Sequence, residues 1–286
     1  MKKHFIGFRF SLLALSLVMV MGCGGRKKQR AWAEKITSVA QDAMQEEHAA
    51  NGVEAGGYGE TEGLEIPTHK GKLSETIRHR TSYVVSYNHD TKQPNWVAWK
   101  LTKSMVKGNL PRATFMDDDD MPDPKGYKSD YYNSGFDKGH LCPAGDNKWS
   151  EKAMNDCFLM TNMCPQNHGL NAGMWNSIEQ QCRNWAKKYG SVYIVCGPLF
   201  LNQQHRKIGR NKVVVPDAFF KVVLRVGKNP QAIGFICRNK SQKGKTKADF
   251  VNSVDEVERI TGYDFYSKLP DNIENKVEAS ADISQW

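Results

Sequence analysis

Five short stretches of this chain are apolar or alternate apolar with polar residues, and they are rich in β-branched and aromatic side chains, which is typical of β-strands. A turn-like segment, 88–94, separates the first two, so we predict that they form an antiparallel pair. Pro198 is expected to end the third, because proline cannot donate to a sheet ladder. The predicted strands are Arg80–Tyr87, Asn95–Thr102, Ser191–Gly197, Ala218–Val226 and Gln231–Cys237.

Two other segments, one from residue 171 onward and one over 249–261, have apolar residues at helical spacing. Together with the strands they predict an α+β fold, with a mixed, mainly antiparallel central β-sheet flanked by helices. After residue 271 the chain becomes polar and is expected to be loose. The apolar stripe of the first helix consists of Trp175, Ile178, Cys182 and Trp185.

The first 23 residues have the pattern of an export signal, with basic residues followed by an apolar run too short to span a bilayer as a mature helix. Val20–Cys23 resembles a bacterial lipobox, which implies a lipid on Cys23; a plain secretory signal is the alternative. We therefore predict an exported bacterial protein in the periplasm, at the outer membrane or at the cell surface, anchored by this lipid. The predicted segments are a lipoprotein-type signal peptide (1–22), a tether or linker with a short helix (23–64), a main domain (65–270) and a polar C-terminal tail (271–286).

Charge is distributed unevenly along the chain, whose formal net charge is +9. Residues 201–248 contain twelve Lys and Arg against one acid, whereas residues 31–65 contain eight acids against one base. The basic region either faces a polyanion or is an ordinary solvated surface. The four acids Asp117–Asp120 are expected to form a solvated loop, because they lack the spaced ligands and turn glycine of a calcium-binding EF-hand.

Six cysteines follow Cys23, and an even number in an exported protein favours disulfides, whose pairing stays open. Cys196 and Cys237 would pair if their strands are neighbours. A zinc site at Cys157, Cys164 and His168 is the alternative, although the usual C-x-x-C pair is absent. The six are Cys142, Cys157, Cys164, Cys182, Cys196 and Cys237.

The candidate chemistry lies in two stretches, 135–144 and 162–183. In the first, His140 is a candidate general base, because an imidazole titrates near pH ~6.5. Asp137 can orient the turn or accept a hydrogen bond, and Gly139 allows a close backbone approach. A lone histidine is more often structural, so this stretch alone predicts no function.

The second stretch contains three polar residues at helical offsets. Glu179 and Arg183 are four residues apart and share the border of the apolar stripe, where they form either a surface salt bridge or part of a cleft. Asn171 begins the predicted helix, as a cap or as a ligand. Phosphodiester hydrolysis needs a base, a cation and further positive groups that hold the phosphate, and the two stretches together contain these.

Five motifs, in order, resemble those of the DNA/RNA non-specific endonucleases, the ββα-metal nucleases. Asp137-Lys-Gly-His140 resembles the D-R-G-H signature, and Leu170-Asn-Ala-Gly-Met-Trp175 followed by Glu179 resembles L-N-x-G-x-W-x-x-x-E. The resemblance covers residues 66–269 and implies a ββα-metal active-site motif within the fold. The other matches are Arg112-Ala-Thr-Phe115 (R-x-x-F), Thr161-Asn-Met-Cys-Pro-Gln166 (S-N-x-x-P-Q) and Gly197-Pro198 (G-P).

The resemblance also implies a role for each matching residue. His140 would be the general base that activates water, and Asn171 the one direct protein ligand of a Mg²⁺ ion, with Mn²⁺ as a substitute. Glu179 would position a water on the metal, and Asn162 would help to order the site. The residues that would contact phosphate are Arg112, Lys138 and Arg183.

These inferences predict a Mg²⁺-dependent, sugar-non-specific endonuclease that hydrolyses DNA and RNA to 5′-phosphate products with a single metal ion, and that reads the backbone without sequence specificity. Lys138 departs from the family, which usually has arginine there; lysine keeps the charge but loses the bidentate fork. Two alternatives stay open. One is a catalytically weak lipoprotein that binds nucleic acid, and the other is an extracytoplasmic phosphodiesterase that acts on small molecules.

Overall fold

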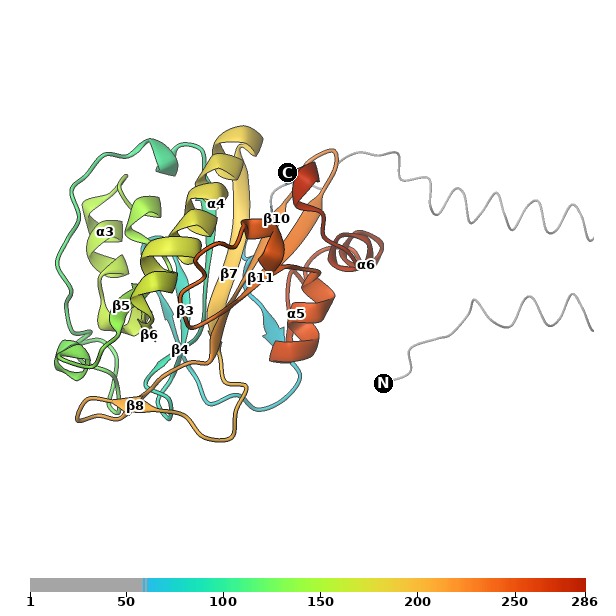
Figure 1. The fold of residues 1–286 in the computed structure, drawn as a ribbon. Helices are drawn as coiled ribbons and strands as arrows, with labels where there is room; N and C mark the ends of the chain where they lie inside the picture. Colours follow the sequence, from blue (N-terminus) through green and yellow to red (C-terminus); the bar gives the residue numbers. More distant parts are fainter. Residues whose placement is uncertain (1–58, 60) are drawn as a thin grey trace, which may run out of the picture. The chain divides into compact units, whose positions relative to one another are not determined.

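The computed structural model describes residue 59 and residues 61–286 of the chain. Its centre is a seven-stranded sheet in which every pair of neighbours is antiparallel, with helices on both faces (Figure 1). The predicted α+β fold class is therefore confirmed. From one edge to the other, the strands are β12 (Val251–Asn252), β11 (Gln231–Arg238), β10 (Ala218–Arg225), β7 (Ser191–Leu199), β4 (Gln93–Thr102), β3 (Val84–Asn88) and β2 (Thr76–His79).

All five predicted strands are present, as β3, β4, β7, β10 and β11, and β3 pairs with β4 in the antiparallel sense. The predicted end of β7 was wrong, because the strand continues through Pro198 to Leu199. Pro198 lies opposite Phe219 of β10, but the pairing of β7 with β4 has already ended at Cys196. One side of the strand is therefore unpaired at this point, which is where a missing N–H is tolerated.

Side chains on β4 alternate between two separate cores, as the period of two in a strand requires. Val97 and Trp99 face a core shared with helices α3 (Glu151–Cys157) and α4 (Asn176–Tyr189), whereas Trp96 faces a core shared with α5 (Val254–Thr261) and α6 (Asp271–Glu278). The apolar stripe predicted before and along α4 is confirmed, since each of its four side chains is at most 1% exposed.

The C-terminal region differs from the prediction in two ways. The second predicted helix begins only at Val254, where the Ser253 hydroxyl accepts a hydrogen bond from the backbone N–H of Glu256. The segment after residue 271 is not loose but forms α6 and the short helix η7 (Ile283–Gln285). It is held by apolar contacts, because Val277 is buried and Trp286 packs on Trp185 with ring centroids 4.5 Å apart.

Several short strands and helices complete the fold. Among the described residues, no helix is both long and apolar enough to cross a membrane. The predicted signal peptide and nearly all of the tether lie outside the described residues. The smaller elements are the paired strands β1 (Thr68–His69) and β13 (Tyr263–Asp264), the paired strands β8 (Lys207–Ile208) and β9 (Val213–Val214), and the short helices η1 (Met105–Lys107), η2 (Lys128–Tyr131), η3 (Ala144–Asp146), η4 (Met160–Asn162) and η6 (Lys247–Phe250).

The acidic loop at 117–120 is not simply solvated. Asp118 is 2% exposed, forms an ion pair with Arg80, and accepts a hydrogen bond from the hydroxyl of Thr161. Asp117 accepts a hydrogen bond from the backbone N–H of Lys128 at 2.8 Å. These carboxylates fix the loop to the domain, because a buried charge is tolerated when it is paired.

The six cysteines of the described residues are buried free thiols, so the predicted disulfides are wrong. Cys196 on β7 and Cys237 on β11 cannot be neighbours, because β10 lies between their strands. The zinc alternative also fails, since Cys157, Cys164 and His168 do not form a metal-binding group among the described residues. Buried thiols of this kind pack as small apolar side chains.

Candidate active site

The segment that carries His140 is the short strand β5 (Asp137–His140), which pairs antiparallel with β6 (Met163–Gln166). The two strands approach closely at Gly139. A Cβ atom at this position would lie 2.3 Å from Oε1 of Gln166, which is far inside van der Waals contact. Glycine is therefore required here for packing, as its place in the predicted turn suggested.

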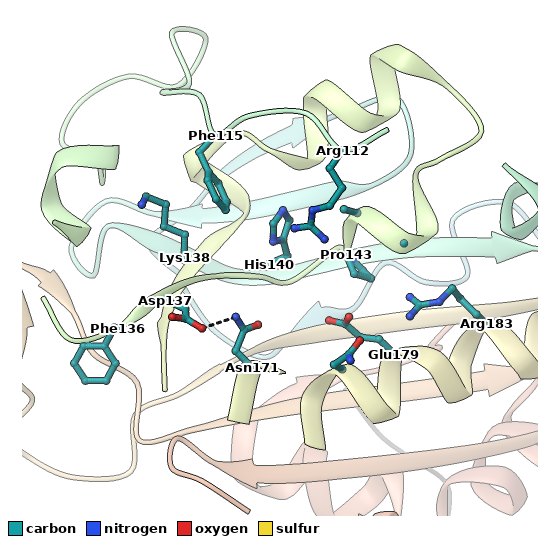
Figure 2. A pocket seen from close by; sticks show the side chains of 13 residues that line it. Arg112, Phe115, Phe136, Asp137, Lys138, His140, Pro143, Asn171, Glu179 and Arg183 are labelled. Atoms are coloured by element: carbon teal, nitrogen blue, oxygen red, sulfur yellow. Dashed lines mark hydrogen bonds between the residues drawn. The ribbon is translucent and has the colours of Figure 1, made fainter. Parts of the chain in front are cut away.

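Six of the seven predicted site residues line one cleft, of about 600 Å³. Figure 2 shows two of them on one wall, Arg112 and His140, facing Asn171 and Glu179 on the other. Segments that are far apart in the sequence therefore converge on a single concave surface. The six are Arg112, Lys138, His140, Asn171, Glu179 and Arg183.

The seventh predicted residue, Asn162, does not line the cleft. It is fully buried, its Nδ2 donates to the carbonyl oxygens of Cys142 and Cys157 at 2.8 Å each, and its Oδ1 accepts from the backbone N–H of Cys142 at 2.9 Å. Asn162 thus ties the chain after His140 to the end of α3. This arrangement fixes the backbone that follows the histidine.

His140 lies against two aromatic rings, with centroid separations of 5.4 Å to Phe115 and 4.7 Å to Phe158. Its Nε2 is buried without a hydrogen-bond partner among the described residues. Burial, and then the positive charge of Arg112, lower the pKa of His140 to about 3. The imidazole is therefore neutral at neutral pH, which is the form that can accept a proton.

Asn171 was predicted to begin the helix. In the structure it lies before the first turn of α4. It belongs to the wide turn Leu170–Trp175, which is kinked at Gly173, and α4 begins only at Asn176. Its Nδ2 donates to Oδ2 of Asp137 at 2.9 Å (Figure 2). The amide is thereby oriented, and its Oδ1 is the atom left to bind a cation or accept a hydrogen bond.

Glu179 and Arg183 share a face of α4, but Arg183 pairs with a third residue. Its Nη1 donates to Oδ1 of Asp146 at 2.8 Å, and Trp99 donates to the other oxygen of that carboxylate at 3.1 Å. Burial is the main cause that raises the pKa of Glu179, to about 7. The charge of this carboxylate therefore changes near neutral pH, as is common for groups at functional sites.

Lys221 lies beneath the cleft and was missed by the sequence analysis. It is fully buried in β10, and its Nζ lies over the rings of Trp99 and Trp175 at 4.9 and 4.6 Å from their centroids. Its charge is the largest influence that opposes the raised pKa of Glu179. The signal for it was present in the sequence, because a lysine stands in the middle of the apolar strand 218–225.

Lys138 lies among aromatic rings at the mouth of the cleft. Its Nζ is 5.2 Å from the ring centroid of Phe115, 5.5 Å from that of Tyr132 and 5.8 Å from that of Tyr131. Tyr132 is exposed. These rings hold the ammonium group by cation–π contact.

Residues 60–272 match the profile of the DNA/RNA non-specific endonucleases, which is most of the chain. The chain belongs to this family. Its structure is similar to a chain in the crystal structure of the EndoG/EndoGI complex, with a TM-score of 0.65 and 29% identity over 70% of this chain and 88% of that one. The family is generally dependent on a divalent metal.

Two curated relatives are a mitochondrial nuclease of Saccharomyces cerevisiae and the mitochondrial nuclease EXOG of Danio rerio. The first is 34% identical over 68% of this chain and 66% of its own length, and the second 35% identical over 67% and 61%. The chain thus spans less than two thirds of either relative. Both are mitochondrial by name, which points away from a lipid-anchored protein of a bacterial periplasm or outer membrane and corrects that prediction.

Proposed function

We propose that this protein is a Mg²⁺-dependent endonuclease that hydrolyses phosphodiester bonds of DNA and RNA without base specificity and leaves 5′-phosphate ends. The observation that carries the proposal is the cleft itself. It is lined by one neutral imidazole, one candidate cation ligand and three positive side chains. Family membership supports the reaction class, and the positive groups favour contact with the backbone over the bases.

In this proposal His140 takes the proton of the attacking water. Burial and the charge of Arg112 make this imidazole a weak base, with a pKa of about 3. A bound phosphate brings negative charge beside the ring, which offsets the positive charge of Arg112 and raises the pKa of His140. The base thus becomes effective when substrate is present. Because the imidazole is buried, its orientation toward the cleft is fixed.

The side chains on the facing wall fit a single Mg²⁺ ion. The donors there are oxygen atoms, the Oδ1 of Asn171 and the carboxylate of Glu179, and Mg²⁺ prefers oxygen ligands while it keeps several waters. When bound, the ion would neutralise charge on the phosphoryl oxygens and the leaving 3′ oxygen. Asn171 would hold the ion and Glu179 would orient its waters. The positive groups that would hold the phosphate are Arg112, Lys138 and Arg183.

A basic segment beside the cleft supports a polymeric substrate. Residues 239–247 include four lysines, and their loop packs against Gly169, two residues before Asn171. Asn239 anchors it, with its Nδ2 donating to the carbonyl oxygen of Pro165 at 3.0 Å. A strand of nucleic acid whose phosphate occupies the cleft would pass close to these lysines, and phosphate neutralisation there would make binding depend on salt.

The test is a gel assay of supercoiled plasmid and of an unstructured RNA with Mg²⁺ or with EDTA. The proposal predicts that both substrates are cut internally with Mg²⁺, that EDTA abolishes cutting, and that the products accept ligation at their 5′ ends. Binding without cleavage would support the weak nucleic-acid binder, and cleavage of a small diester alone would support the small-molecule phosphodiesterase. Either result would refute the proposal.

A further inference from the structure

A cluster of carboxylates lies between the two C-terminal helices, away from the cleft. Asp255 and Glu258 project from α5 and Glu278 from α6, and one oxygen of each lies within 4.8 Å of the others. The two helices pack beside each other on the core opposite to that of α4 (Figure 1). The cluster is therefore separated from the candidate active site by the central sheet.

Glu278 is the unusual member of the cluster, because it is 4% exposed and its Oε1 has no hydrogen-bond partner among the described residues. Glu258 is satisfied only in part, since its Oε1 accepts from the backbone N–H of Phe265 at 2.7 Å. The four charged groups that act most strongly on Glu278 are all acids: Glu258, Glu274, Asp255 and Asp264. A buried carboxylate that faces other acids without a partner is strongly unfavourable unless a cation or a proton occupies the cluster.

We propose that Asp255, Glu258 and Glu278 bind a divalent cation of the Ca²⁺ type, which joins α5 to α6. Oxygen atoms around one ion are separated by at most twice the ion–oxygen distance, which is about 5 Å for Ca²⁺ and about 4 Å for Mg²⁺. Oxygens that lie within 4.8 Å of one another are inside this limit for Ca²⁺. Three carboxylates, of which one is exposed at the rim, also leave room for the additional waters that Ca²⁺ accepts.

The competing occupant is a proton. Burial, followed by the neighbouring carboxylates, raises the pKa of Glu278 to about 9, so that without a cation its carboxyl group is neutral at pH 7. A proton would let Glu278 donate a single hydrogen bond to a neighbouring carboxylate, whereas a cation binds all three carboxylates at once. The two occupants make different predictions, because only the cation makes the stability of the protein depend on Ca²⁺.

The experiment uses the full chain with Asn171→Ala, which removes the cation ligand of the cleft, and titrates it with CaCl₂ by calorimetry and by thermal unfolding at pH 7.5. We expect one bound Ca²⁺ and a rise in Tm of several degrees. Glu278→Gln added to this background should lower the affinity at least tenfold and remove the rise in Tm. Glu256→Gln is the matched control, because Glu256 lies on α5 between Asp255 and Glu258 but pairs with Arg259 instead.

Absence of Ca²⁺ binding in the Asn171→Ala protein, or binding that Glu278→Gln leaves unchanged, would overturn the proposal in favour of the proton. If Glu278→Gln fails to fold, Asp255→Asn at the exposed rim supplies the same comparison. The nuclease assay with Mg²⁺ separates this site from the cleft. With Asn171 intact, Glu278→Gln is expected to cleave plasmid at the parental rate.

Discussion

The raised pKa of Glu179 predicts an acid limb in the pH profile of the nuclease. Below its pKa of about 7 the carboxyl group is protonated and no longer attracts a cation or orients water. Between pH 8 and pH 6 the ionised fraction falls about tenfold, so kcat/KM should fall about tenfold over this interval. An ordinary glutamate would give this limb near pH ~4.3 instead.

The structure also sets the direction in which this limb should move. Lys221 is the largest charge that favours the ionised form, so Lys221→Met should shift the acid limb to higher pH. A bound cation favours the same form, so saturating Mg²⁺ should shift it to lower pH. Glu179→Gln should lower the rate and remove the limb altogether.

The assay is the initial rate of cleavage of a fluorescent oligonucleotide duplex from pH 5 to pH 9. It is run at subsaturating substrate and subsaturating Mg²⁺, because the apparent rate constant then reports the pKa values of the free protein. Lys228→Met, an exposed lysine in the turn after the same strand, is the matched control. A limb that persists in Glu179→Gln, or one that stays in place in Lys221→Met, would refute the reasoning.

Three further predictions concern the walls of the cleft. Gly139→Ala should destabilise the domain by about 1–3 kcal/mol and lower activity, because its Cβ would collide with Gln166, and urea unfolding at parental stability would contradict this. Asp146→Ala should cost about 3–5 kcal/mol by the same measurement, because it leaves Arg183 without its partner; a change below about 1 kcal/mol would show that the ion pair contributes little. Lys138→Met should slow cleavage about a hundredfold, whereas Lys138→Arg should stay near the parental rate, and equal rates for the two variants would remove Lys138 from the phosphate site.

Much of the fold could be predicted from the sequence, because its signals are local. Alternation along β3 and β4, and the stripe from Trp175 to Trp185, depend on the period of each element and on which face is buried. Features set by tertiary contact could not be read in this way. The helix α6 has a polar sequence but is held by Val277 against the sheet, and β7 continues past Pro198 only because one neighbouring strand has ended there.

The candidate site, too, could be predicted from the sequence only where its signals are local. Motif spacing located six of the cleft residues, but it did not reveal that the helix kinks between Asn171 and Glu179, nor that Arg183 pairs with Asp146. Those arrangements depend on groups that are distant in sequence. The cysteines illustrate the opposite error, since an even count and an export-like leader favoured disulfides, whereas all six thiols are buried and free. In the folded protein these thiols pack as small apolar side chains.

The central claim is that the cleft cuts phosphodiester bonds with His140 as the base, and His140→Ala tests it most directly when binding and cleavage are measured separately. We predict that kcat falls about 10²–10⁴-fold while the affinity for a DNA duplex, measured by anisotropy in EDTA, changes less than about threefold. His69→Ala, an exposed histidine on β1, should behave like the parent. Cleavage by His140→Ala at the parental rate would contradict the account.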